Sequence, residues 1–198
     1  MGDTIFVRVS VLQRVSHLKP LIMTTFLFRL AVALFFFCHA GALRAADSVY
    51  VFAEAHLQAT VPGSHWHLQP RQEKNGRVIY VFKRDPISDS SGRNIIPNFA
   101  VVIETIEPNT DVVTYSVNKR ANNAFHMTSM FTREDGTIKL INAVGYKGVY
   151  TDALPHTVYV IHAINGHKGF QVILDTTTDT FGAMDAEFLA ILHSLRVK

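Results

Sequence analysis

Residues 157–176 read TVYVIHAINGHKGFQVILDT, and this stretch decides the fold. Two runs rich in apolar and β-branched residues, Thr157–Ile164 and Phe170–Thr176, have the length that is typical of strands. Asn165-Gly166 lies between them, and Asn-Gly is the dipeptide that most favours a tight hairpin turn. The stretch therefore predicts two neighbouring antiparallel strands.

Further segments with a period of two extend this sheet. Asn75-Gly76 predicts a second hairpin, between Trp66–Gln72 and Val78–Phe82. Phe99–Ile106 begins with apolar residues on both faces, as a central strand covered on each side does. The other expected strands are His56–Val61 (followed by a turn at 62–64), Tyr146–Thr151, and the pair Met127–Thr132 and Thr137–Asn142 around Asp135-Gly136.

Two segments have the period of an amphipathic helix. Thr110–Phe125 is expected to be capped by its first residue or by Asn109. Phe181–Leu195 is expected to be capped by Asp179 or Thr180. Each helix then packs its apolar face on the sheet. The first face consists of Val113, Val117, Ala121 and Ala124 or Phe125, and the second of Phe181, Met184, Phe188, Ile191, Leu192 and Leu195.

The predicted fold class is therefore α+β, with a largely antiparallel β-sheet of six or more strands packed against two main helices. No repeat or linker divides the chain after its N-terminal segment, so we expect one domain there. The residues expected to be buried in its core are Trp66, Phe99, Val101, Ile103, Val117, Phe125, Val158, Val160, Phe170, Val172, Leu174, Phe188, Ile191 and Leu192.

Four local stretches match a known pattern in the same order. Val61–Trp66 has a proline shortly before a tryptophan, and Glu107–Asn109 precedes the first helix. Gly145–Tyr150 opens a run of antiparallel strands, and Phe188–Leu195 closes the chain as a helix. Together they resemble the PsbP/Mog1-like fold family over roughly residues 48–197.

That resemblance implies a scaffold whose surface docks a partner protein. The family includes the PsbP-related photosystem proteins, the Ran-binding Mog1 protein and exported bacterial families. Its members share no set of catalytic residues that could be carried over to this sequence. The resemblance therefore implies no catalytic residue here, and we expect no cofactor.

The N-terminal segment has the parts of a signal peptide. Arg29 supplies a positive charge, Leu30–Cys38 is an unbroken apolar run, and Ala40–Ala42 fits the cleavage pattern of small residues. Met23 is the better start, which makes the preceding residues an extension. We expect residues 1–46 to be this extension and signal peptide, and residues 47–198 to be the single PsbP/Mog1-like domain.

Two alternatives concern the same segment. Ala45-Ala46 is a second possible cleavage site. An uncleaved membrane anchor is the other alternative, but a span needs about 20 apolar residues, and Arg29 and His39 interrupt this run. We therefore expect a periplasmic or secreted bacterial protein with no permanent membrane span after cleavage.

The charge of the chain is misleading. Its formal net charge is +3, but five of the 19 Lys and Arg residues and one of the 16 acids precede residue 47. The remainder is near −1, which argues against a nucleic-acid partner. Cys38, the one cysteine, also precedes residue 47, so the expected domain has no disulfide and no cysteine-based metal site.

His65 and His67 are the most suggestive pair for chemistry. On a strand both point to the same face, with Trp66 on the other. Two imidazoles can share a zinc or copper ion when a third ligand joins them. Spacing identifies no third ligand, so the pair is a weak metal candidate and we expect no metal site. The alternative is that Trp66 anchors the core and both histidines are solvated.

Residues 84–94 form the longest polar stretch. Its charged side chains, Asp85, Asp89 and Arg93, are candidate contacts to a ligand or partner. The alternative is a simple hairpin connection. Ser90-Ser91 has no identifiable base partner, and no Gly-x-Ser-x-Gly motif is present.

Other candidates for catalysis have simpler explanations. His162 lies within an apolar strand, where a hydrogen-bonded core histidine is expected. Asp175 and Asp179 flank three threonines where capping is the expected role.

The function that these patterns favour is an exported, non-catalytic binding or assembly module with a protein partner in the cell envelope. A periplasmic enzyme, or a metal-binding protein using the His65/His67 region or the 84–94 loop, is the alternative.

Overall fold

The computed structural model describes residues 46–121 and 125–198. Of the predicted extension and signal peptide, residues 1–45 lie outside the described residues. Within them, no helix is long and apolar enough to cross a membrane.

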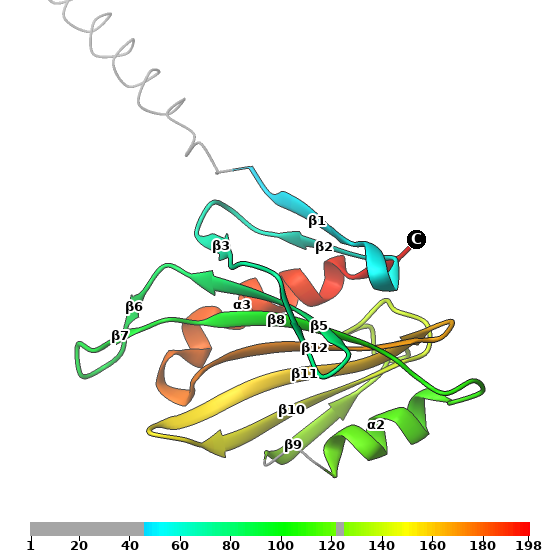
Figure 1. The fold of residues 1–198 in the computed structure, drawn as a ribbon. Coiled ribbons are helices and arrows are strands. Elements are labelled where there is room, and N and C mark those ends of the chain that lie inside the picture. The colour runs from blue at the N-terminus through cyan, green and yellow to red at the C-terminus, as the bar shows by residue number, and fades with distance from the viewer. Residues whose placement is uncertain (1–45, 122–124) are drawn as a thin grey trace, which may run out of the picture. The chain divides into compact units, whose positions relative to one another are not determined.

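An eight-stranded sheet forms the centre of the fold (Figure 1). All its neighbouring strands pair antiparallel, as predicted. Its path runs through β3 (Trp66–Leu68), β5 (Arg77–Arg84), β8 (Asn98–Thr105), β12 (Lys168–Thr177), β11 (Pro155–Asn165), β10 (Ala143–Thr151) and β9 (His126–Phe131), with β4 (Gln72–Lys74) also paired to β5.

Two smaller sheets accompany it. One is a three-stranded sheet in the order β1 (Ser48–Phe52), β2 (Leu57–Val61) and β13 (Arg196–Val197), with the short helix η1 (Ala53–Ala55) between β1 and β2. The other is the ribbon of β6 (Ile87–Ser88) and β7 (Asn94–Ile95).

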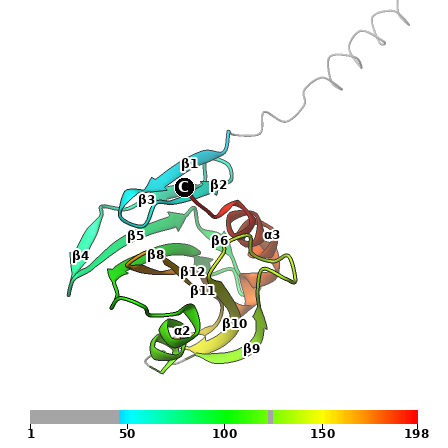
Figure 2. The same cartoon turned by 90° about the vertical axis from the view of Figure 1, so that its right-hand side faces the viewer.

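The two helices, α2 (Val112–Arg120) and α3 (Thr178–Ser194), lie on opposite sides of the large sheet (Figure 2). The three-stranded sheet lies on the same side as α3, and its strand β2 contacts α3. The α+β architecture with two main helices is therefore confirmed.

Alternation of side chains along β8 and β12 explains the main core. Phe99, Val101 and Ile103 point to the α3 side, and Phe170 and Val172 lie opposite them on β12. Of the predicted core residues, the following are buried: Trp66, Phe99, Val101, Ile103, Val158, Val160, Phe170, Val172, Leu174, Phe188, Ile191 and Leu192.

An ion pair fastens α3 to the sheet. The guanidinium of Arg84 donates from Nε and Nη2 to the two carboxylate oxygens of Glu187, at 3.0 and 2.8 Å. Trp66 donates from Nε1 to the same carboxylate, and its ring packs near Phe188. These contacts anchor Trp66 to the core, as expected.

The hairpin around Asn75-Gly76 forms as predicted. Both residues have positive φ, 52° and 71°, which is the requirement of a type I′ turn. The strand before it is interrupted, however, because β3 ends at Leu68 and β4 begins at Gln72. Pro70 lies in the gap and has no N–H to donate to a ladder.

The prediction for the first helix was wrong in its packed face. Val113 and Val117 are 65% and 58% exposed, whereas Tyr115 and Ser116 are buried. Phe125 is only partly buried. The cap was also wrong, since Asp111 accepts the first free N–H groups of the helix. The helix is short and has few apolar residues, so its polar contacts determine which face packs on the sheet.

The second helix begins earlier than predicted. Its N-cap is Thr177, and neither Asp179 nor Thr180 caps it. Asp179 instead accepts a hydrogen bond from the backbone N–H of Ser90, at 2.6 Å. Asp175 binds side chains of neighbouring strands and is no cap either.

The predicted strand Thr137–Asn142 does not form. Its partner β9 pairs with β10 instead. Period two is nevertheless present, because Ile138 and Leu140 are buried and Lys139 and Ile141 are exposed. The segment covers the main core without forming a strand in the described residues, and it bends at residues 141–142, where Asn142 has a φ of 52°. This arrangement creates the groove described next.

Candidate functional site: a groove beside β13

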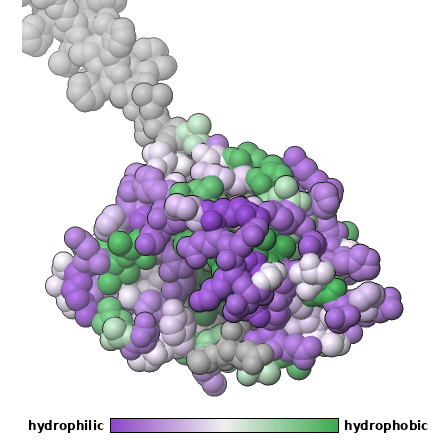
Figure 3. All heavy atoms as spheres, in the orientation of Figure 1, coloured by the Kyte–Doolittle hydropathy of each residue, from purple (hydrophilic) through white to green (hydrophobic). Residues whose placement is uncertain are grey.

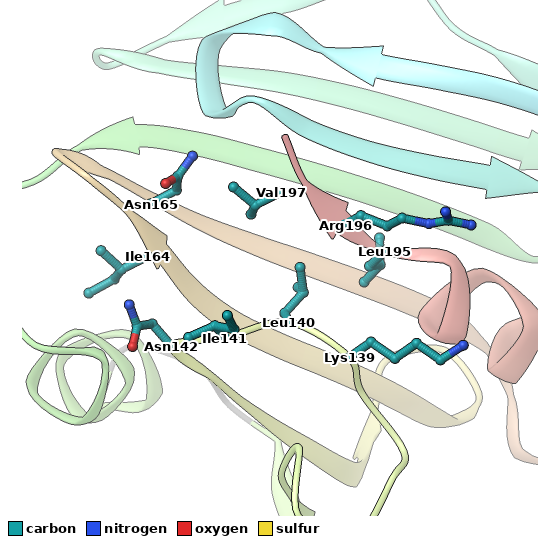
Figure 4. A pocket seen from close by; sticks show the side chains of 9 residues that line it. All are labelled: Lys139, Leu140, Ile141, Asn142, Ile164, Asn165, Leu195, Arg196 and Val197. Carbon is teal, nitrogen blue, oxygen red and sulfur yellow. The ribbon is translucent and has the colours of Figure 1, made fainter.

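A groove of about 660 Å³ lies between segment 139–142 and strand β13 (Figure 4). This volume falls within the range of about 300–1,000 Å³ that is common for ligand sites. Its lining residues come from three parts of the chain: Lys139, Leu140, Ile141, Asn142, Ile164, Asn165, Leu195, Arg196 and Val197.

Buried leucines form part of its apolar lining. Leu140 and Leu195 belong to the main core and are 2% and 0% exposed. Ile141 and Val197 are 66% and 39% exposed beside them. The groove therefore offers apolar contacts to an occupant without opening the core.

The charged lining residues are all cationic. Lys139 and Arg196 are exposed, and neither forms an ion pair within residues 46–121 and 125–198. Figure 4 shows both at the end next to α3, with Asn142 and Asn165 at the opposite end. The groove is thus polarised, with a positive end and an amide end.

The backbone beside the groove is held at two points. Ile164 donates its N–H to the carbonyl of Asn142, at 3.1 Å. Asn165 donates from Nδ2 to the carbonyl of Ala55, at 3.0 Å. These bonds tie the end of β11 to both the 139–142 segment and η1.

His65 and His67 point to the same side, as expected from their spacing, and both bind one carboxylate. Asp85 accepts from His65 Nδ1 at 3.0 Å and from His67 Nε2 at 2.7 Å. These bonds, that from His67 first, lower the pKa of Asp85. All three side chains are about half exposed. In the part of the chain that the structure describes, no group of three or more metal-ligating side chains could hold an ion.

The other two predicted contact residues of the 84–94 loop bind each other. Asp89 accepts from the backbone N–H and from Nε of Arg93, at 2.8 and 2.6 Å. The backbone bond is the first cause of the lowered pKa of Asp89, whose carboxylate is almost completely buried. The pair closes the β6–β7 turn, and a contact of either residue to a ligand or partner stays a prediction.

A buried polar cluster connects α2 to the sheet. Ser116 Oγ lies 2.7 Å from both Tyr146 OH and His162 Nδ1. His162 Nε2 is buried and has no hydrogen-bond partner among the described residues. Burial, with Lys119 and Arg120 nearby, lowers the pKa of His162 to about 4. Ser116 and His162 are 1% and 0% exposed, so this serine–histidine pair cannot meet a substrate in this conformation.

A second histidine cluster lies where β10 ends and β11 begins. Asp175 accepts from Tyr150 OH at 3.0 Å, and His156 Nδ1 lies 3.0 Å from its other oxygen. Tyr150 stacks on the His156 ring. Burial raises the pKa of the Tyr150 hydroxyl. Asn98 donates to the same carboxylate. The Tyr150 hydroxyl also lies 3.3 Å from His156 Nδ1. The cluster thus joins the ends of β8, β10, β11 and β12.

The surface outside the groove carries no broad apolar area on the face shown in Figure 3, where apolar atoms form small separate patches among polar ones. Exposed apolar side chains occur singly or in pairs elsewhere, as at Val49 and Val51 on β1. Such scattered residues are normal for a protein surface.

Sequence reasoning missed the groove. The one signal that pointed to it was the alternation of Ile138 and Leu140 with Lys139 and Ile141. We interpreted it as a strand, although the same pattern describes any extended segment that covers a core. Nothing in the sequence places this segment beside Arg196.

No protein-family profile matches the chain. No curated protein matches it either. Among solved structures, the chain is similar to the cyanobacterial PsbP (CyanoP) of Synechocystis sp. PCC 6803, with 16% sequence identity and a TM-score of 0.51 over 80% of this chain and 96% of that one. The domain has the PsbP/Mog1-like fold. The predicted resemblance is thereby confirmed at the level of fold.

Two further solved structures are similar at lower scores. LpqN of Mycobacterium tuberculosis, which is involved in cell envelope biogenesis, has 14% identity and a TM-score of 0.49 over 76% of this chain and 89% of that one. The Ran-binding protein Mog1p of Saccharomyces cerevisiae has 8% identity and a TM-score of 0.48 over 77% and 96%. Identities this low carry no statement about function.

Proposed function

We propose that the domain is an exported, non-catalytic binding module that docks a partner protein in the cell envelope, with the groove beside β13 as its docking face. The observation that carries this proposal is the pair of unpaired cations, Lys139 and Arg196, beside an apolar lining. An open groove of this composition suits recognition because the apolar lining supplies affinity and the charges supply orientation.

The chemistry of the lining favours binding over catalysis. An enzyme site needs a convergent acid and base, and the nine lining residues include no Asp, Glu, His, Ser or Cys. The buried or partly buried groups with strongly shifted pKa values, which are Tyr115, Tyr150, Tyr159 and His162, do not line the groove. Acid–base residues and the groove thus occupy different parts of the fold.

The contacts predicted at His65, His67 and Asp85 stay a separate prediction. Their convergence supports a polar patch near the start of β3. The two histidines already share both oxygens of the Asp85 carboxylate, so we place the docking face at the groove.

Site-specific crosslinking tests the docking face. A photoreactive phenylalanine derivative is introduced at Ile141, within the groove, and at Val49, an equally exposed apolar position on β1. After irradiation of living cells we expect a covalent adduct with one envelope protein from position 141 and none from position 49. An absence of adducts from position 141, with the variant protein folded and present at normal levels, would contradict the proposal.

Mass spectrometry tests export. The protein isolated from the cell that naturally produces it should lack the residues before about 43–47, because signal peptidase cleaves after the small residues there. Recovery of the chain with this segment intact, in the cytosolic fraction, would refute export.

A further inference from the structure

We propose that the occupant of the groove is an extended, acidic segment of the partner protein, which adds as a strand to the free edge of β13. This inference rests on the proposed function and specifies its partner. It is carried by three features of the groove: a strand edge, a positive end and an apolar lining.

The strand edge comes from the pairing of β13. This strand is the last in the order β1-β2-β13, so one of its edges has no strand partner in the part of the chain that the structure describes. Lys198 donates its N–H to the carbonyl of His56, at 2.9 Å. In an antiparallel pair, successive residues alternate between pointing their N–H and C=O at the partner strand and away from it.

It follows that Val197, one residue earlier, points its N–H and C=O away from β2. Val197 also lines the groove, and Figure 4 shows β13 between β2 and the 139–142 segment. A polypeptide in the groove can therefore exchange two backbone hydrogen bonds with Val197. Such strand addition is a common way of binding an extended peptide.

The positive end selects the charge of that peptide. Lys139 and Arg196 both lie on the α3 side of the groove, and no acidic residue is among the lining residues. Carboxylates at one end of the occupant would compensate both cations, and a planar guanidinium such as that of Arg196 can bind a carboxylate through two parallel hydrogen bonds.

The apolar lining selects the rest of the segment. Ile141 and Val197 flank the groove with exposed side chains, above the buried Leu140 and Leu195. An extended peptide points alternate side chains to opposite faces, so one apolar face can cover these residues while the other remains in water. A fatty acid would satisfy the cations and the leucines but would leave the Val197 backbone groups without partners.

Fluorescence anisotropy with designed peptides tests the inference. The probe is a short labelled peptide with two glutamates followed by alternating valine and threonine, and the comparison peptide has lysines in place of the glutamates. Against the protein as purified, we expect the glutamate peptide to bind at least about tenfold more tightly than the lysine peptide.

Charge reversal in the protein gives the matched comparison. In a Lys139→Glu/Arg196→Glu variant, affinity for the glutamate peptide should fall about tenfold, as expected for two exposed ion pairs that become repulsive. A Lys74→Glu/Lys83→Glu variant changes the net charge equally at exposed positions outside the groove, and its affinity should change less than about twofold.

The strand edge has its own variant. Val197→Pro removes the N–H that faces the groove, and proline is tolerated on edge strands. It should abolish binding while leaving the thermal midpoint unchanged, and Val197→Ala, which keeps the N–H, should bind within about threefold of the unaltered protein.

Several results would overturn the inference. Equal affinity for the two peptides would do so, as would unchanged peptide binding by Val197→Pro. Binding of decanoate without binding of either peptide would identify a different occupant. A dimer in sedimentation that dissociates in the charge-reversal variant would identify a second copy of the chain as the occupant. If position 141 still gives the crosslinked adduct in cells, such a result leaves the proposed function intact and removes only the acidic strand. Failure of both experiments removes the docking face itself.

Discussion

Replacing Phe188 with alanine should lower the free energy of unfolding by about 3–5 kcal/mol. Phe188 is on the buried face of α3 and is 0% exposed. Its ring lies between those of Trp66 and Phe181, with centroids at 6.3 and 6.1 Å. Alanine leaves a cavity that these rings cannot fill without moving, so the transfer cost and the cavity cost add.

Urea unfolding measured by circular dichroism checks this prediction. Val49→Ala is the matched control because Val49 is 57% exposed, and its effect should stay within about 0.5 kcal/mol. A loss below about 1 kcal/mol for Phe188→Ala, with an unchanged dependence on urea, would mean that α3 does not pack on the sheet as described.

Acidification from about pH 7 to pH 4 should destabilise the domain by about 3 kcal/mol through His162 alone. The pKa of this imidazole is about 4 in the folded protein, against 6.5 for an unperturbed histidine. Between these values the unfolded chain binds the proton more readily than the folded one. The contribution of neutral His162 is therefore complete above about pH 6.5 and is lost as the pH falls towards 4.

The surroundings of His162 explain the direction. On α2 it faces Ser116 and the cations Lys119 and Arg120, and on β10 it faces Tyr146. Glu104 on β8 acts in the opposite direction but is paired with Lys119. A third positive charge beside Lys119 and Arg120 is unfavourable. Nε2 is buried without a hydrogen-bond partner among the described residues, and the side chain of Gln171, like Glu104, acts in the opposite direction.

The measurement is the free energy of unfolding at pH values between 4 and 7, in the unaltered protein and in His162→Gln. The difference in stability between the two proteins should shrink by about 3 kcal/mol from pH 7 to pH 4. A constant difference would show that His162 titrates normally in the folded state. Both proteins contain carboxylates such as Asp85, so the contribution of these groups to the pH dependence cancels in the difference.

Strands were predictable where pattern and turn chemistry agreed. Thr157–Ile164 and Phe170–Thr176 lie within β11 and β12, whose hairpin was expected from Asn165-Gly166. Helix α3 was predictable because its apolar stripe is long and includes Phe188. In both cases the local signal and the burial in the core point to the same structure.

Prediction failed where polar contacts decide the packing. Helix α2 turns Tyr115 and Ser116 to the sheet rather than its valines. Tyr115 fits because Gly169 below it has no side chain: a Cβ there would lie 2.6 Å from the tyrosine ring. Such a pairing between residues distant in sequence leaves no periodic signal.

The candidate site was unpredictable for a related reason. The groove exists because segment 139–142 and β13, more than fifty residues apart in sequence, approach the same end of the core. His65 and His67, by contrast, are two positions apart at the start of β3, so their common direction was predictable from the alternation of side chains along a strand. Their partner Asp85 was not paired with them by any signal in the sequence.

The central claim is that this domain binds a protein through the groove beside β13. The most direct test compares crosslinked adducts in living cells from three exposed apolar positions: Ile141 in the groove, Val49 on β1 and Val117 on α2. We predict one discrete adduct, formed from position 141 at least about tenfold more than from the other two and lost in the Lys139→Glu/Arg196→Glu background. An adduct formed mainly from position 117 or 49, or equally from all three, would contradict the account.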